Sequence, residues 1–202
     1  MEPKEREIKL YLQNLSVLDD RLRICGADLA RERLLERNLR LDTAERSLEK
    51  SGRLLRLRQD DRVRITYKAD AQVEGGVVTR TELEFIADDF AISKKLFEAL
   101  GYQVVVVYEK YRREYRLGDV KVMLDELPFG DFIEIEAPNI TLIDGVVQML
   151  GLDRSKGIET NYLGLLEIVK NNLDLPFRDL TFENFTNLAI SPEDLGVQPA
   201  DA

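Results

Sequence analysis

Charged and apolar residues alternate along several segments of this 202-residue chain, and the alternation limits the folds that the chain can form. Glu82 and Glu84 alternate with Leu83 and Phe85, and similar alternation recurs in other segments. Side chains two residues apart lie on the same face of a β-strand. Each of these segments is therefore predicted to be a strand with one charged face and one apolar face.

The charged faces contain same-sign pairs, Glu-x-Glu three times and Arg-x-Arg at Arg56 and Arg58. An antiparallel sheet with one face in water explains any single strand of this kind. Like charges on one face repel, however, unless another strand or a ligand supplies the opposite charge. If the sheet closes into a barrel, the charged faces can line its interior. The charged faces contain Glu5, Glu7, Lys9, Arg56, Arg58, Arg62, Arg64, Lys68, Glu82, Glu84, Lys110, Arg112, Glu114, Arg116, Glu134 and Glu136.

The predicted elements are typical of an α+β fold, and eight antiparallel strands with helices in the connections can close into a β-barrel with a charged interior that the helices cover. Residues 70–76 are expected to form a loop with a turn at Gly75-Gly76, and Ser16 with Asp19 is expected to cap the first helix. The predicted strands are 3–12, 27–42, 53–59, 62–69, 77–86, 103–117, 120–127 and 131–137. The predicted helices lie near 16–26, 43–52, 88–101, 141–150 and 161–171.

Residues 1–172 are predicted to form this tunnel domain. Residues 173–202 contain Pro176, Pro192 and Pro199 and only a weak apolar pattern. We therefore expect them to be a loosely ordered C-terminal appendage whose role the sequence does not define.

Composition excludes several kinds of function. The net charge of −9 argues against a nucleic-acid or anionic-membrane binder, because such surfaces need an excess of Lys and Arg. There is no histidine and only one cysteine, Cys25, so a histidine triad or a multi-cysteine zinc site is impossible. A bound metal would have oxygen ligands, which favours Mg²⁺, Mn²⁺ or Ca²⁺. No membrane span or signal peptide is apparent, and we expect a cytoplasmic protein.

The ordered motifs resemble those of the CYTH superfamily, the triphosphate tunnel metalloenzymes, which include class IV adenylyl cyclases, thiamine triphosphatases and inorganic triphosphatases. The resemblance covers about residues 3–170. One departure is Asn161-Tyr162, where the family commonly has Ser-Tyr. The matching stretches are EREIK, LLRLR, RITYK, RTELEF, YEKYRREYRL and VMLDELPFGDFIEIE.

The resemblance implies roles for individual residues. Glu5, Glu7, Glu134 and Glu136 would be metal ligands for Mg²⁺ or Mn²⁺, with Asp125 or Glu84 acting through water. Lys9 would balance the acidic charges and contact the substrate or the attacking group, so that Lys9, Glu5 and Glu7 form the catalytic set. The residues implied to bind phosphate oxygens are Arg56, Arg58, Lys68, Lys110, Arg112 and Lys156.

We expect a metal-dependent phosphohydrolase that acts on a small-molecule triphosphate, namely tripolyphosphate, thiamine triphosphate or ATP. The alternative enzyme is a class IV adenylyl cyclase, which would convert ATP to cyclic AMP and pyrophosphate with almost the same triphosphate grip. A second alternative is a non-catalytic polyphosphate-binding or nucleotide-binding module, although the paired carboxylates argue against it. The protein is expected to be a monomer or a homodimer.

Overall fold

The computed structural model describes residues 4–74 and 77–202, except for the side chains of residues 4, 5 and 74. The strands are β1 (Lys4–Leu12), β2 (Asp28–Asp42), β3 (Leu54–Gln59), β4 (Val63–Glu74), β5 (Val77–Ala87), β6 (Gln103–Leu117), β7 (Val120–Leu127) and β8 (Gly130–Glu136). The helices are α1 (Leu15–Ile24), α2 (Ser47–Lys50), α3 (Phe90–Ala99), α4 (Ile140–Met149), the 3₁₀-helix η1 (Arg154–Lys156) and α5 (Tyr162–Leu173).

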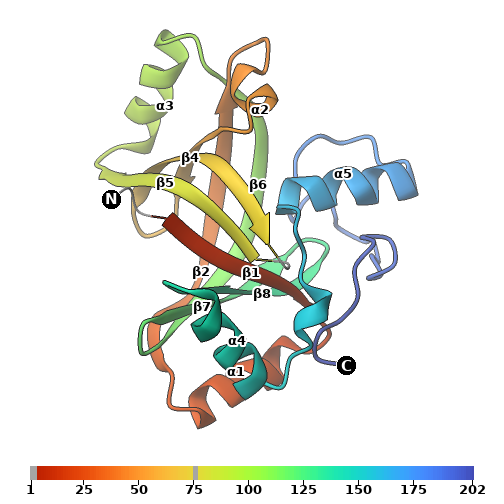
Figure 1. Ribbon diagram of the computed structural model, residues 1–202. Coiled ribbons are helices and arrows are strands. Elements are labelled where there is room, and N and C mark those ends of the chain that lie inside the picture. The colour runs from red at the N-terminus through yellow and green to blue at the C-terminus, as the bar shows by residue number, and fades with distance from the viewer. Residues whose placement is uncertain (1–3, 75–76) are drawn as a thin grey trace.

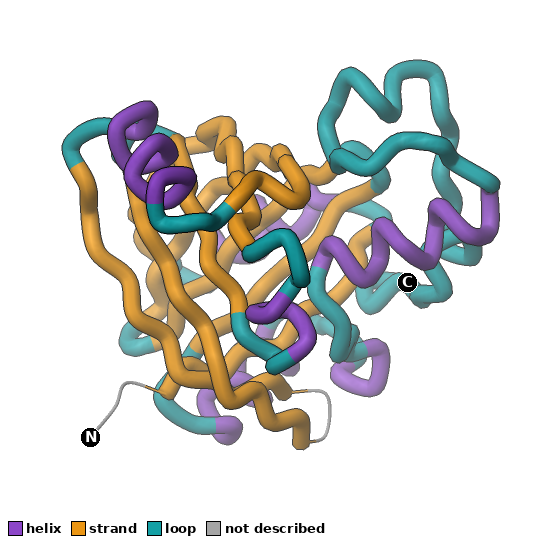
Figure 2. The backbone as a smooth tube through the Cα atoms, turned by 90° about the horizontal axis from the view of Figure 1, so that it is seen from above, coloured by secondary structure: helices purple, strands orange, loops and turns teal. Residues whose placement is uncertain are grey.

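The strands form a closed ring in which each strand is antiparallel to both of its neighbours (Figure 1, Figure 2). The order around the ring is β1-β5-β4-β3-β2-β6-β7-β8. β1 closes it, because Lys9 pairs with Glu134 of β8 on one edge and Glu7 pairs with Val78 of β5 on the other. The predicted eight-stranded antiparallel fold of the α+β class is confirmed.

The apolar faces of the strands point outward, as the alternation predicts, and helices cover most of them. Ile8 of β1 and Ile133 of β8 are fully buried in one cluster with Leu22 of α1 and Ile143 of α4. Burial of a side chain of this size contributes about 1.5–3 kcal/mol. On another side of the barrel, α2 and α3 cover the outer faces of β2 and β3. The helices therefore hold the barrel from outside and leave its interior to the charged residues.

The C-terminal segment 174–202 is packed against the barrel, although none of its described residues forms a helix or a named strand. Leu180 and Leu195 are fully buried in a cluster that also contains residues of α5. The Leu180 amide donates to the Val107 carbonyl at 2.9 Å, and the Leu180 carbonyl accepts from the Glu109 amide at 2.8 Å. The expectation of loose order is therefore wrong: the segment lies along the edge of β6 and needs no periodic apolar pattern to do so. The domain division at residue 172 stays a prediction.

The last residues of the chain hold the end of β1. The Ala200 amide donates to the Tyr11 carbonyl at 3.0 Å. The Asp201 carboxylate accepts from the amides of Gln13 and Asn14 at 2.8 and 2.9 Å. The C-terminal segment therefore joins β6 to β1, which are not neighbours in the ring.

Three local expectations are corrected. β4 continues through the predicted loop to Glu74, because a register shift between Ala69 and Gln72 absorbs the irregular residues, including Asp70 with a φ of 55°. The predicted turn at 75–76 lies outside the described residues. Asn14 caps α1, since its side chain accepts from the Val17 amide at 3.3 Å.

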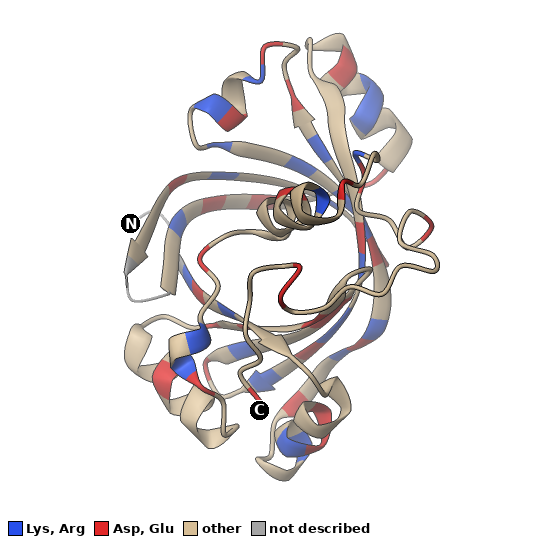
Figure 3. Cartoon of the chain, turned by 90° about the vertical axis from the view of Figure 1, so that its right-hand side faces the viewer, with Lys and Arg blue, Asp and Glu red and all other residues tan. Residues whose placement is uncertain are grey.

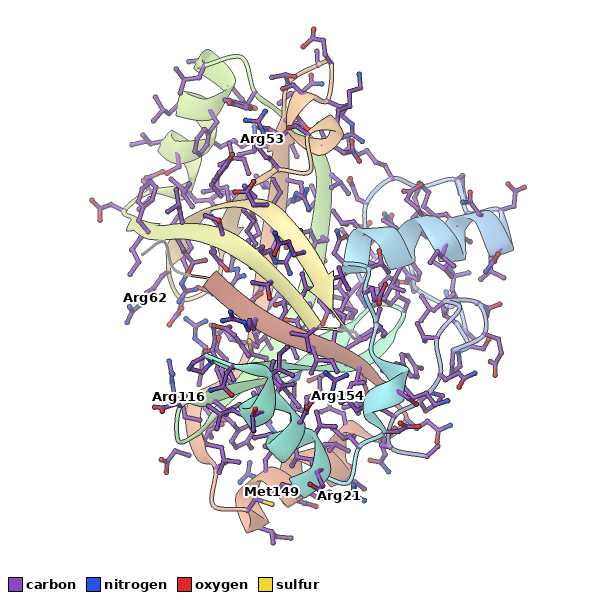
Figure 4. All side chains as sticks on the ribbon, viewed as in Figure 1. Arg21, Arg53, Arg62, Arg116, Met149 and Arg154 are labelled. Atoms are coloured by element: carbon purple, nitrogen blue, oxygen red, sulfur yellow. The ribbon has the colours of Figure 1, made fainter. Side chains whose placement is uncertain are left out.

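The third correction concerns two arginines that the alternation places on the charged faces. Arg62 precedes β4, and Arg116 lies close to the end of β6. Both are exposed and lie at the edge of the molecule (Figure 4). Alternation therefore fails at the strand ends, where the ring no longer encloses the side chain. In the described part of the chain, no helix is long and apolar enough to span a membrane.

We predict that Leu180→Ala lowers the free energy of unfolding by about 2–5 kcal/mol, because it removes a fully buried side chain from the cluster that joins the C-terminal segment to the barrel. Urea denaturation measures the effect. Leu188→Ala in the same segment is the control, since Leu188 is 40% exposed and its truncation should change the stability little. Equal, small effects of both substitutions would show that the segment does not stabilise the barrel.

Asp131, near the start of β8, is a carboxylate in an unfavourable place. Burial and the nearby charge of Glu126 raise the pKa of Asp131 to about 6. A carboxyl group with a raised pKa in the folded state favours folding only while it is protonated. Its contribution is present below the unfolded-state pKa of about 4 and is lost as the pH rises through about 6.

Asp131→Asn should therefore stabilise the protein at neutral pH and have little effect near pH 4. We expect a gain of about 1–2 kcal/mol above pH 7, after allowance for the solvent that reaches this group. Urea denaturation at several pH values between about 4 and 8 measures it. Asp119→Asn, in the exposed turn between β6 and β7, is the matched control. A gain in stability that does not grow with pH would contradict the raised pKa of Asp131.

A charged cavity inside the barrel

The barrel encloses a cavity of about 120 Å³ whose lining is mostly ionic. Among the described residues, nine Lys and Arg side chains and five Glu side chains line it, so its wall is basic although the whole chain has a net charge of −9. Charged residues appear on strands all around the ring, and α5 lies across the opening in Figure 3. The basic residues are Lys9, Arg40, Arg56, Arg58, Lys68, Arg80, Lys110, Arg112 and Lys121, and the acidic ones are Glu7, Glu82, Glu84, Glu134 and Glu136.

One wall of the cavity comes from β2, β3 and β6 and is basic. Arg58 donates to Glu36 at 3.1 Å and to Asn38 at 3.2 Å, both of which lie on β2. Lys110 lies 3.7 Å from the other Glu36 oxygen. Glu36 is therefore a buried carboxylate that holds the Arg58 and Lys110 side chains in place. Its single negative charge leaves the wall with a net positive charge.

A second buried carboxylate, Asp125 of β7, fixes the next group of cations. Arg112 donates to both oxygens of Asp125 at 2.6 and 2.5 Å, and Lys110 donates at 2.8 Å. The Tyr162 hydroxyl of α5 also donates to Asp125, at 2.8 Å. A bidentate guanidinium–carboxylate pair has a defined geometry. Arg112 is therefore held in one orientation, and it also contacts Glu134.

The opposite wall, from β1 and β8, contains three of the five acidic lining residues, Glu7, Glu134 and Glu136. Glu7 pairs across the strands with Glu136, and Lys9 pairs with Glu134, whose carboxylate is 3.4 Å from the Lys9 amine. Each acid also has a cation from another strand: Arg80 contacts Glu7, and Lys121 lies 3.2 Å from Glu136. In this arrangement, no three acidic side chains of the described residues form a ready cluster for a metal ion.

The ion pairs shift the pKa values of the buried groups. Burial acts to raise the pKa of Glu36, but Arg58 and Lys110 outweigh it and lower that pKa far below its usual range. For Glu134, burial is likewise outweighed by Arg112, Lys110 and Lys9, so its pKa is also lowered. Burial and the charge of Arg112 lower the pKa of Lys110. The carboxylates of Glu36 and Glu134 thus remain ionised at neutral pH.

Buried donors without a hydrogen-bond acceptor among the described residues occur in this region. They include the Arg56 Nε and the Asn38 Nδ2 atoms. The remaining nitrogens of Arg56 donate to the Tyr108 hydroxyl at 3.3 Å and to Thr66 at 3.1 Å. A buried donor without an acceptor costs about 1–3 kcal/mol. An anion bound beside Arg56 would remove part of this cost.

The structure places most of the predicted site residues on the cavity. The residues that line it are Glu7, Lys9, Arg56, Arg58, Lys68, Glu84, Lys110, Arg112, Glu134 and Glu136. Glu84 lies on the basic side, 3.6 Å from Arg56, and not beside Glu134. Asp125 is fully buried behind the lining residues, where its carboxylate accepts hydrogen bonds from Lys110, Arg112 and Tyr162.

Lys156 is not among the residues that line the cavity, and for Glu5 only the backbone is described. Lys156 lies on η1, where its amine contacts Gln198, so the structure does not bring it to the other phosphate-binding candidates. The side chain of Glu5 lies outside the described residues, although its backbone pairs with that of Arg80.

The sequence analysis did not assign several residues of the site, among them Glu36, Arg40, Arg80, Tyr108 and Lys121. Arg80 and Lys121 share the parity of the assigned acidic residues on their own strands, so extending the alternation by one step from Glu82 and by two steps from Asp125 finds them. Glu36 and Arg40 lie on β2 in a regular stretch from Leu34 to Arg40, but register shifts before Leu34 and after Arg40 make this stretch short. Alternation cannot be followed through such irregularities.

A wider space joins the cavity at the end that α5 covers. It has a volume of about 640 Å³ and shares with the cavity residues of the barrel and of α5. Its wall includes apolar residues of β6 and α5 and several cations, among them Arg46, Arg53 and Lys170. We call this space the vestibule. It differs from the cavity because it offers apolar surface beside charge.

A closed antiparallel barrel with an ion-lined interior is thus the class of protein that the fold and the site define. The chain belongs to the CYTH domain family, which matches residues 3–142. Residues beyond 142, including α5 and the C-terminal segment, lie outside this match.

The comparisons with individual proteins agree with this family. A Methanocaldococcus jannaschii protein named putative adenylate cyclase is 25% identical over 134 residues, which span 65% of this chain and 75% of that protein. The structure of a putative adenylate cyclase from Vibrio parahaemolyticus superposes with a TM-score of 0.72 and 19% identity, covering 83% of this chain and 99% of that one. The PH1012 protein of Pyrococcus horikoshii gives a TM-score of 0.67 and 26% identity, covering 78% and 96%.

Proposed function

We propose that the protein is a divalent-metal-dependent phosphohydrolase that binds a triphosphate in the barrel cavity. The observation that carries the proposal is the charge of the lining: nine cations against five carboxylates, inside a chain of net charge −9. Random placement of charge in so acidic a chain would give an acidic wall. A basic, enclosed wall attracts a small polyanion.

The basic wall is proposed to bind the phosphate oxygens. Arg56 and Arg58 approach from β3, Lys68 from β4, and Lys110 with Arg112 from β6. Arg58 and Arg112 are already oriented by Glu36 and Asp125, so little side-chain entropy is lost when they bind an anion. The free Arg56 Nε atom supplies a further donor.

The acidic wall is proposed to hold the metal ion. Glu7, Glu134 and Glu136 lie on adjacent strands, and carboxylate oxygens are the ligands that Mg²⁺ and Mn²⁺ prefer. Their chemistry therefore fits such an ion. To bind it, Glu7 would have to give up its ion pair with Arg80, and Glu136 its ion pair with Lys121. Glu5 remains a proposed fourth ligand. Asp125 is better explained as the residue that orients Lys110 and Arg112.

In the proposed reaction, water attacks the terminal phosphorus, the bond to the bridging oxygen breaks, and the products are phosphate and a diphosphate. A bound divalent ion would supply charge neutralisation and a more acidic water. Lys9 is held by Glu134 at 3.4 Å and by the Thr160 carbonyl at 3.4 Å, with its amine 4.4 Å from the Tyr162 ring centroid. It is therefore placed to neutralise charge on the attacked phosphate. Arg112 and Lys110 would stabilise the charge that develops on the equatorial oxygens.

A second candidate reaction is the formation of cyclic AMP from ATP. The vestibule favours a substrate with an organic group, because its 640 Å³ and its apolar residues would serve no purpose for inorganic tripolyphosphate. The name of the M. jannaschii relative points the same way. Hydrolysis remains the first proposal because it requires only water as the attacking group, whereas cyclisation also requires a tightly positioned ribose.

The decisive experiment incubates the protein with tripolyphosphate, thiamine triphosphate and ATP, each with Mg²⁺ or Mn²⁺, and resolves the products by phosphorus NMR. We expect orthophosphate to be released and turnover to stop when the metal is chelated. Formation of cyclic AMP with pyrophosphate would show that the protein is a cyclase and not a hydrolase. Binding of a triphosphate without turnover of any of the three substrates would overturn both enzymatic proposals. The protein would then be a non-catalytic binding module.

The double substitution Glu7→Gln with Glu136→Gln tests the metal assignment. We expect turnover to fall on the order of 100-fold or more, and Mg²⁺ to lose its effect on the melting temperature, because both charged ligands are gone. Glu32→Gln with Glu45→Gln removes the same charge from the exposed outer surface and is the matched control. Full activity in the Glu7 and Glu136 variant would remove the acidic wall from the mechanism.

A further inference from the structure

Arg40 of β2 is a cation of the site to which the proposed function gives no role. It lines both the cavity and the vestibule, so it lies where the two spaces join. It is partly buried, and among the described residues no hydrogen bond or ion pair involves its guanidinium group. The residues before it on the inner face of β2 are engaged, because Glu36 and Asn38 both accept from Arg58. Arg40 thus differs from its neighbours in having no counter-charge from the described part of the chain.

The residue directly opposite Arg40 is another arginine. Arg40 pairs with Arg56 of β3, and both residues line the cavity. Directly opposite residues have Cβ atoms about 4.5–5.5 Å apart, and like charges in this position destabilise a sheet. Burial lowers the pKa of Arg40, and the charge of Arg56 acts in the same direction. Glu84 lies 3.6 Å from Arg56 but forms no ion pair with Arg40.

The carboxylates that line the vestibule are committed to other partners. They are Asp42, Glu49 and Glu167. Asp42 accepts from three main-chain amides at 2.8 to 3.0 Å. Glu49 and Glu167 each form an ion pair with a basic residue three positions away, at 3.1 and 2.9 Å. An anionic ligand can therefore supply the counter-charge that Arg40 lacks.

The position of the arginine pair defines which part of a bound anion it would contact. Arg58 and Arg112 line the cavity but not the vestibule, whereas Arg40 lines both. Beside Arg40, β6 contains one extra residue, Val105, which also lines the vestibule. A phosphate group between Arg40 and Arg56 would therefore lie at the vestibule end of the phosphate chain.

We propose that Arg40 and Arg56 bind one phosphate group between them, and that Arg40 thereby selects a triphosphate over a diphosphate. This inference rests on the proposed function. A guanidinium group can bind a phosphate through two parallel N–H···O bonds, and the Nε donor of Arg56 has no other acceptor among the described residues.

The selection follows from the length of the anion. A diphosphate can contact the cations at the inner end of the cavity, such as Arg58 and Arg112, without reaching Arg40. A third phosphate group extends the anion to the vestibule end. Its charge there also removes the repulsion between Arg40 and Arg56. Arg40 therefore contributes to the binding of the longer anion alone.

Calorimetric titration of Arg40→Met with tripolyphosphate and with diphosphate, each in the presence of Ca²⁺, tests this role. Met keeps an unbranched apolar side chain and removes the guanidinium group. We expect tripolyphosphate binding to weaken about 10- to 100-fold and diphosphate binding less than about 3-fold, because only the longer anion loses a charged hydrogen-bond donor. Arg37→Met, at an exposed position of the same strand, is the matched control and should change neither affinity.

Two further measurements separate a contact with the anion from a structural role. The melting temperature of ligand-free Arg40→Met should equal or exceed that of the wild-type protein, because the substitution removes a like-charge pair. Arg40→Lys keeps the charge but not the two-donor fork. Its preference for tripolyphosphate over diphosphate should therefore lie between those of the wild-type protein and Arg40→Met.

The outcomes distinguish this inference from the proposed function. Arg40→Met that keeps the wild-type preference for tripolyphosphate would overturn the role of Arg40 and leave the proposed function intact. Equal weakening of both anions would also overturn it, because Arg40 would then contribute only to the general positive potential. A marked decrease in the melting temperature would show that Arg40 stabilises the free protein and would contradict the inference. A wild-type protein that binds neither anion would overturn the proposed function as well.

Discussion

The compensation of buried charge is the constraint on which this structure depends. Arg112, Lys110, Asp125 and Glu36 are almost fully withdrawn from water, and each lies within a few ångströms of an opposite charge. The removal of an ion from water costs several kcal/mol, and well-packed apolar side chains in its place often make a protein as stable or more stable. The charged interior is therefore better explained by what it binds than by what it contributes to stability.

The rest of the fold follows from this interior. Because alternate residues of every strand point inward with their charges, the other residues form an apolar outer surface, and α1 to α4 cover most of it. The C-terminal segment then forms main-chain hydrogen bonds with β6 on either side of Tyr108. It also bonds to Tyr11 of β1, two residues after Lys9. Tyr108 and Lys9 both line the cavity. The segment thus supports the site although it lies outside the family match at residues 3–142.

Strand alternation predicted the strands and their charged faces, because same-sign pairs such as Arg56 and Arg58 are tolerable only where opposite charges meet them. The closed sheet and most of the lining were predicted when the resemblance to the CYTH superfamily was added. Alternation did not predict Glu36, since the regular stretch of β2 around this residue is short, with register shifts before Leu34 and after Arg40. The packing of residues 174–202 was also missed: main-chain hydrogen bonds to β6 and single buried residues such as Leu180 leave no periodic signal. Lys156 was assigned by resemblance alone, and the structure places it against Gln198.

The central claim is that the cavity is a binding site for a chain of phosphates. Calorimetric titration with phosphate, diphosphate and tripolyphosphate, in the presence of Ca²⁺ to limit turnover, tests it most directly. Because the cations come from strands around the whole ring, the account predicts saturable binding of one tripolyphosphate per chain, with an affinity that rises at each added phosphate and falls with salt. No saturable binding, or equal affinity for all three anions, would contradict it.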